Sequence, residues 1–423
     1  MRIFVLELKK LFNWKLLLAL AVLCGLTYAA FMSSGVHSYN TMSGIFGNYQ
    51  REMFEKYGDE LTPKEYADYD VPGKIAEVTA ELDAIIAAEP TFAKYGIYRY
   101  ADYEAGMQAF DEKYFADLQP GPLPQPYGDD QGIMMAAIYQ TFAVVGDSVI
   151  GIAARNTPTE RLAQLKAVER YYSPNKESVQ SFARLDMRPV VSEAAAEYFE
   201  RTTFNLINYD LTLMFSLNAA IVAVFAVLAS LVLIAPFITT DRARKMQYLQ
   251  YSAKAGRKVF RTQTFAAAVA ALLVGIVVIA ATYALFFAKT DAADYLNSGA
   301  QLYSGMSFFI YNVTFGQYVA ILAGMTLALC AAAACFAVVL GRYSSNIVGM
   351  MLKAVPVGAA ASVLAALALL YSFNSNNFLT SGRIARITGG VPYAEAVICA
   401  GALLIGLAAA AVVVIREQRA DAA

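Results

Sequence analysis

The residue types that most often carry out catalysis or bind metal ions are scarce in this 423-residue chain. It has one histidine, His37, and no HExxH sequence, so a histidine-rich metal site and a zinc protease site are excluded. The four cysteines lie in apolar runs without CxxC spacing, and we interpret them as small buried hydrophobic residues. These cysteines are Cys24, Cys330, Cys335 and Cys399.

Sequence motifs of the common membrane and nucleotide enzymes are also missing. No GxxxxGK[ST] sequence is present, so the chain is not by itself a P-loop ATPase. An aspartyl intramembrane protease needs a Tyr-Asp pair on one span and a Gly-x-Gly-Asp sequence on a later one. Tyr209-Asp210 fits the pair, but Gly146-Asp147 lacks the first glycine and precedes it, and no rhomboid-like GxSG is found. We therefore expect neither enzyme activity nor a cofactor on this chain.

The composition is that of a membrane protein. Hydrophobic residues make up 58% of the chain and charged residues only 16%, with a mean hydropathy of +0.45, which excludes both an ordinary soluble domain and a disordered chain. The net charge of −1 is a cancellation. Residues 33–210 contain 15 basic and 27 acidic residues, whereas the rest contains 18 basic and 7 acidic residues. The chain thus consists of two physically different parts.

Six stretches are long and apolar enough to cross a bilayer, which takes about 20 helical residues. They are residues 14–32, 211–238, 262–288, 315–340, 347–373 and 391–415. The first is broken only by Lys15 near its start, and two others contain an ionisable residue near one end, Lys353 and Glu395. Either could mark a transport path; we interpret both as side chains that reach the nearer membrane interface. The sequence therefore predicts an all-α integral membrane protein with six transmembrane helices.

Basic residues in the short loops predict the orientation, because Lys and Arg are retained on the cytoplasmic side. Both termini are then cytoplasmic, residues 33–210 are extracellular, and the protein is a multi-pass protein of the plasma membrane. Residues 133–154 could form a seventh span, but Gln140 and Asp147 are costly in lipid, and we expect a buried or membrane-surface helix there. The first span could alternatively belong to a cleaved signal peptide.

The predicted organisation has three parts. Residues 1–32 contain the first span, preceded at 2–13 by a short amphipathic helix in the cytoplasmic interface, with Phe4, Leu8 and Leu11 on one face and Glu7 mostly off it. Residues 33–210 form a large, mainly helical extracellular insert, and residues 211–423 contain the other five spans.

The insert has clear helix signals. Thr62-Pro63-Lys64-Glu65 and Thr157-Pro158-Thr159-Glu160 both fit a capping box, and apolar residues recur with helical spacing over 75–86. Alternating prolines over 120–126 predict an extended connector. Its 16 tyrosines and its acidic charge could bind a cationic amphipathic ligand, or could serve packing and solubility.

The sizeable cytoplasmic loop, residues 239–261, is the strongest sign of a protein partner. It contains one acidic residue, Asp241, and seven basic ones. Topology alone accounts for that charge. The order of the residues is further evidence for a partner. An acidic residue after the second span is followed by an amphipathic turn, a serine, a glycine and a basic pair.

In this order the chain resembles the permease subunits of ABC-2 type ABC transporters, especially the Gram-positive subfamily with a large extracellular domain between the first and second transmembrane helices. Family members have an interfacial N-terminal helix, six spans and a loop of the type E-x-x-x-G-T…L-L-x-S…G-R-R-K. Here Asp241 replaces the usual Glu, Gln263 stands where Lys is common, and Lys245-Met246 replaces Gly-Thr. The expected ATPase-docking residues are Asp241, Arg242, Leu249, Ser252, Gly256, Arg257 and Lys258.

The resemblance implies a mechanism and partners. The loop would be a coupling helix that docks on a separate nucleotide-binding ATPase subunit, where ATP and Mg would bind. A second permease chain, identical or homologous, would complete the assembly in the lipid bilayer, and no nucleic acid is involved. The expected function is export or extraction of an amphipathic substrate, such as a peptide, an antibiotic or a lipid-like molecule. The alternative is a non-transporting membrane receptor or scaffold whose extracellular domain binds a ligand.

Overall fold

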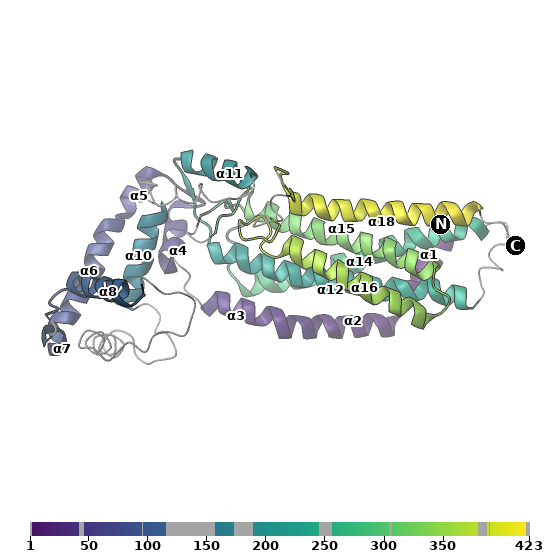
Figure 1. Cartoon of the computed structure of the whole chain (residues 1–423), viewed down its shortest axis with the longest axis horizontal. Coiled ribbons are helices and arrows are strands. Elements are labelled where there is room, and N and C mark those ends of the chain that lie inside the picture. Colours follow the sequence, from purple (N-terminus) through teal and green to yellow (C-terminus); the bar gives the residue numbers. More distant parts are fainter. Residues whose placement is uncertain are drawn as a thin grey trace. The chain divides into compact units, whose positions relative to one another are not determined.

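The computed structural model describes residues 2–41, 46–94, 96–115, 157–172, 189–244, 256–303, 307–379, 387–388 and 390–419. Its contacts divide the chain into two compact units (Figure 1). We call residues 1–42, 179–201 and 205–423 the bundle unit, and residues 43–178 and 202–204 the insert unit. Each unit is described by itself.

Within the described residues, six helices of the bundle unit are long and apolar enough to cross a membrane, which confirms the predicted all-α class and the six predicted spans. The first is continuous over Trp14–Asn40 and comprises α2 (Trp14–Thr27), the π-helical turn η1 (Tyr28–Met32) and α3 (Ser33–Thr41). The others are α12 (Tyr209–Ala243), α14 (Gly256–Lys289), α15 (Phe315–Arg342), α16 (Ile347–Leu369) and α18 (Ala394–Arg419).

Some helix ends differ from the prediction for local reasons. The first helix continues past residue 32 because the following polar residues contain no proline to end it. Helix α16 ends at Leu369 rather than 373, since Tyr371 and Phe373 adopt positive φ angles of 52° and 63°, which no helix interior allows. Helix α18 begins two residues after Pro392 and runs to Arg419.

Helices α12 and α14 are longer than a membrane requires. With 35 and 34 residues at about 1.5 Å each, both measure roughly 50 Å, whereas the hydrocarbon core is about 30 Å thick. Helix α12 is also the most buried of the six candidate spans and packs against α14, α15 and α16. At their connection, α12 and α14 extend five and six residues past the predicted apolar segments, which is about 8–9 Å of helix.

A separate helix, α1 (Arg2–Leu11), precedes the first span, as the sequence predicts. The chain leaves the helix at Phe12 and Asn13, and the Asn13 side chain then accepts a hydrogen bond from the backbone N–H of Lys15, which caps α2. Helix α1 and the last turn of α18 lie at the same end of the bundle (Figure 1).

The opposite end of the bundle contains the connections around residues 290–314 and 370–393. Helix α11 (Pro189–Glu200) belongs to this unit, although the predicted insert boundaries include it. The ring centroids of Tyr198 and Phe308 are 5.5 Å apart, and those of Phe199 and Tyr303 are 6.2 Å apart. Aromatic packing therefore joins α11 to the connection before α15.

The insert unit is mainly helical. Its elements are α4 (Gly47–Tyr57), β1 (Glu60–Leu61), α5 (Pro63–Tyr69), α6 (Val71–Ala88), α7 (Pro90–Lys94), α8 (Tyr100–Phe115) and α10 (Pro158–Tyr172), and β1 pairs with β2 (Phe204–Asn205). The predicted Thr62–Glu65 capping box is confirmed: the Thr62 side chain accepts from the backbone N–H of Glu65, and the Glu65 side chain accepts from the backbone N–H of Thr62. At α10 the Thr157 hydroxyl accepts from the backbone N–H of Glu160, as predicted. The predicted helix 133–154 and proline connector 120–126 lie outside the described residues.

Candidate partner-docking site

Exposed basic side chains gather at one end of the bundle, where α12, α15 and α18 finish and α14 and α16 begin. We call it the basic end, and the opposite end, with the 290–314 and 370–393 connections, the loop end. The exposed cations of the basic end are Lys9, Lys10, Lys15, Arg244, Arg261, Lys353, Arg416 and Arg419. They come from α1, from the start of α2, from both helices that flank the predicted docking loop, and from α16 and α18.

The acidic residues of the basic end are turned inward instead. Glu7 and Glu417 are only 5% and 9% exposed, and Asp241 is half-buried. Glu417 Oε1 accepts a hydrogen bond of 2.5 Å from Arg342 Nε, and Glu7 Oε1 lies 2.8 Å from Lys10 Nζ. The outer surface of the basic end is therefore more positive than a count of its basic and acidic residues indicates.

Gln263 joins two of these acids. Its Nε2 atom lies 2.9 Å from Asp241 Oδ2 and 3.2 Å from Glu7 Oε2, and the residue is 3% exposed. A primary amide has two N–H donors, so one group can serve both carboxylates, and only the nitrogen can face them because the amide oxygen donates nothing. We call this set the Glu7–Gln263–Asp241 junction. It connects α1, α12 and α14 at the base of the predicted docking loop.

Apolar packing supports the junction. The rings of Phe4 and Phe265 are 5.5 Å apart, and Leu11 is 2% exposed. The prediction that Glu7 lies mostly off the apolar face of α1 is therefore wrong. Positions 4, 7, 8 and 11 follow helical spacing, so Glu7 belongs to the same face as Phe4 and Leu11. That spacing is the sequence signal that could have identified Glu7 as a functional candidate.

The Arg342–Glu417 pair fixes the other half of the basic end. It joins the last turn of α15 to the last turns of α18, and its side chains are 18% and 11% exposed. Nearby, the exposed Lys353 Nζ donates a 2.7 Å hydrogen bond to the backbone oxygen of Tyr343, which closes the turn between α15 and α16. Every helix that ends or begins here, apart from α2, is thus held by a polar contact.

The structure places the predicted docking residues unequally. Asp241 is half-buried in the junction rather than presented to a partner. Arg242 lies in the last turn of α12, while Gly256, Arg257 and Lys258 open α14. Leu249 and Ser252 lie outside the described residues, as do the side chains of Arg242, Arg257 and Lys258. The docking role of these residues stays a prediction.

The loop end buries an acid in a different setting. Glu395, in the first turn of α18, is 0% exposed and lies within electrostatic reach of Tyr318 and Cys399. The interpretation that this side chain reaches the membrane interface is therefore wrong. The N-terminus of a helix favours a negative charge, and α15 packs against α18, so the carboxyl is turned inward. Lys353, by contrast, is exposed.

The basic end presents charged and hydrogen-bonding side chains. Among the described residues no group of three or more His, Cys, Asp or Glu side chains is arranged to hold a metal ion. Comparisons with known proteins found no matching family model, no matching curated protein and no matching solved structure. The site is a row of exposed cations on helices that polar contacts join to one another. Such a surface suits electrostatic docking of a protein with an acidic surface.

Proposed function

We propose that this chain is the transmembrane permease subunit of an ATP-driven ABC transporter that exports or extracts an amphipathic substrate. A peptide, an antibiotic or a lipid-like molecule fits that class, and the energy comes from a separate ATPase subunit. In this proposal the basic end and both termini are cytoplasmic, the insert unit is extracellular, and the chain resides in the plasma membrane. The exposed cations of the basic end support that orientation.

The observation that carries the proposal is the Glu7–Gln263–Asp241 junction. A partner that displaces the loop between α12 and α14 moves the helices only if the helix ends stay folded and move with the loop. Asp241 and Gln263 lie at the two ends of that loop and share a 2.9 Å hydrogen bond, and Glu7 adds α1 to the same contact. A displacement of the loop is thereby passed to three helices together.

The length of α12 and α14 supports the same mechanism. At the loop both helices continue about 8–9 Å past their predicted apolar segments, so the loop begins outside those segments, where a soluble subunit can reach it. A rigid helical extension acts as a lever on the membrane-spanning part. The ATPase and a second permease chain, identical or homologous, are the partners that this arrangement serves, with ATP and Mg bound by the ATPase.

Co-purification from native membranes tests the proposal. Arg257→Glu together with Lys258→Glu reverses two charges at the start of α14, and Lys94→Glu together with Arg99→Glu reverses two exposed charges of the insert unit, outside the basic end, as a matched control. We expect the wild type and the control to retain a protein that contains a Walker A sequence and hydrolyses ATP. The loop variant loses it by more than about tenfold, because like charges repel across the interface.

Two results would contradict the proposal. One is the recovery of no ATPase with the wild-type chain. The other is equal loss with the loop and control variants, which would point to general charge rather than a docking loop. Either result would favour the receptor or scaffold, in which the insert unit binds a ligand and no ATP is consumed.

A further inference from the structure

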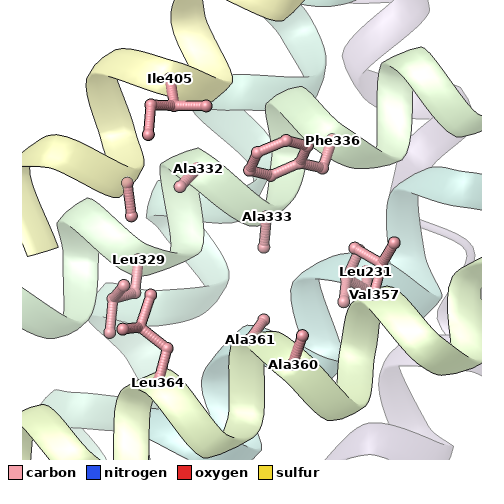
Figure 2. A pocket seen from close by; sticks show the side chains of 11 residues that line it. Leu231, Leu329, Ala332, Ala333, Phe336, Val357, Ala360, Ala361, Leu364 and Ile405 are labelled. Carbon is pink, nitrogen blue, oxygen red and sulfur yellow. The ribbon is translucent and has the colours of Figure 1, made fainter.

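A groove with a purely apolar lining lies between α12, α15, α16 and α18, and its volume is about 290 Å³. Its floor includes the buried Leu231, Leu329 and Ala333, and its rim includes the exposed Ala360 and Ile405. Figure 2 shows Ala360 facing Ala333 across the hollow, with no polar side chain between them. The lining residues lie in the middle of their helices, so the groove is at the depth of the hydrocarbon core.

Two close helix contacts keep the groove open. A Cβ atom on Gly406 would lie 3.2 Å from the Cα atom of Ala332, so α18 is seated directly on α15. A Cβ atom on Gly358 would lie 3.3 Å from Leu228 Cδ2, so α16 is seated on α12. Closure of α16 and α18 over the groove would require the loss of these two contacts.

Water does not suit this space. A buried water needs two to four polar partners, and all the lining side chains are hydrocarbon. If the groove were empty, the side chains that line it would lose van der Waals contacts. Since the surroundings at this depth are lipid, a hydrocarbon chain is the material available to fill the groove.

The size of the groove selects among apolar occupants. It is about twice the 150 Å³ of an apolar cavity that binds benzene, which is room for part of one chain. A transmembrane helix from a second protein is about 10–12 Å across and does not fit inside it. The size of the groove therefore suits a flexible, narrow ligand.

We propose that this groove binds one acyl chain of a bilayer phospholipid, with the alanines of α15 and α16 in contact with the chain. The groove recognises the hydrocarbon and makes no polar contact with it. This inference stands independently of the transporter proposal, because it depends only on the four helices and their position in the bilayer.

Photo-crosslinking in vesicles tests it. The full chain is reconstituted in phosphatidylcholine that contains a lipid with a diazirine on one acyl chain, and labelled peptides are mapped by mass spectrometry. We expect label concentrated on residues 360–364 and 402–405. Ala361→Phe and Ala402→Phe fill the groove and lower that label by about tenfold, which corresponds to about 1.4 kcal/mol of lost binding free energy. Ala359→Phe and Ala400→Phe, exposed on the same helices outside the groove, leave it unchanged.

Folding is checked on the same samples, because label on the exposed Leu352 and Val355 must persist in every variant. If the groove label falls only in variants that also lose this outer label, Phe336→Ala provides a second measurement, since it enlarges the groove and must retain the label. Uniform labelling of all exposed apolar positions, unaffected by either filling variant, would overturn the proposal. Crosslinks from the groove to a second copy of the chain instead of lipid would also overturn it.

Discussion

The two ends of the bundle unit hold their helices together with different sets of contacts. At the basic end each acid has a polar partner that crosses between helices: Glu7 and Asp241 share Gln263, and Glu417 pairs with Arg342. At the loop end, Glu395 is buried in the first turn of α18, within electrostatic reach of Tyr318. The loop end combines hydrogen bonds with a dense aromatic cluster, in which Phe215 contacts five other rings.

This difference determines how each end responds to a substitution. The polar contacts of the basic end each depend on one or two side chains, so a single change there removes a link between helices. Aromatic packing is lost in proportion to the volume removed. We infer that the basic end passes a displacement between helices through a few individual contacts, whereas the loop end holds its helices through many contacts at once.

The largest expected effect is at the loop end. Phe215→Ala removes a fully buried ring that lies within 4.9 to 6.3 Å of its five aromatic neighbours on α14 and α15. We expect the free energy of unfolding to fall by about 3–5 kcal/mol, measured by thermal or denaturant unfolding in detergent. Phe31→Ala, at a position that is 64% exposed, is the matched control and should change little. Equal losses in both variants would refute the aromatic account of this end.

A smaller effect is expected from the Arg342–Glu417 pair. Glu417→Ala leaves the Arg342 guanidinium mostly buried without its carboxylate, and breaking such a pair costs about 3 kcal/mol when burial is nearly complete. Both side chains keep some exposure, so we expect a loss of about 2 kcal/mol in the same unfolding assay. Replacing both partners, with Arg342→Met and Glu417→Leu, should recover most of the loss. A double variant as unstable as the single one would show that packing rather than charge is responsible.

Much of the fold can be predicted from sequence because it depends on local properties. The six spans follow from the length of apolar runs, and the cap of α5 follows from four consecutive residues, Thr62–Glu65. Neither requires knowledge of distant contacts. The ends of the spans are less predictable, since features such as the positive φ angles of Tyr371 and Phe373 arise from the connections around them.

The candidate site is less predictable because its contacts are long-range. Glu7 and Gln263 are 256 positions apart, and nothing near either residue indicates that they meet. Whether an acid at a helix end reaches the interface or turns inward depends on what packs over it, which is why sequence alone misplaces Glu395. Alanine-rich segments have the same ambiguity. Ala332 is buried in a close helix contact whereas Ala360 is exposed at the rim of the groove that both residues line, although both lie in alanine-rich runs.

The smallest and most informative expected effect concerns Gln263. Gln263→Leu removes the donor that serves Glu7 and Asp241, and leaving buried acceptors unsatisfied costs about 1–2 kcal/mol. Gln263→Lys supplies an ammonium between the same two carboxylates and should be at least as stable as the wild type. Arg261→Leu, at an exposed position two residues earlier on α14, is the control.

Hydrogen–deuterium exchange separates a junction from ordinary packing. If Gln263 ties α1 to the bundle, the amides of residues 4–11 exchange faster in Gln263→Leu than in the wild type, while Gln263→Lys and Arg261→Leu retain slow exchange. The aromatic loop end should exchange alike in all four proteins, because Gln263 lies at the other end of the bundle. Unchanged exchange in α1 would show that apolar contacts such as Phe4–Phe265 alone hold this helix, and the basic end would then resemble the loop end rather than contrast with it.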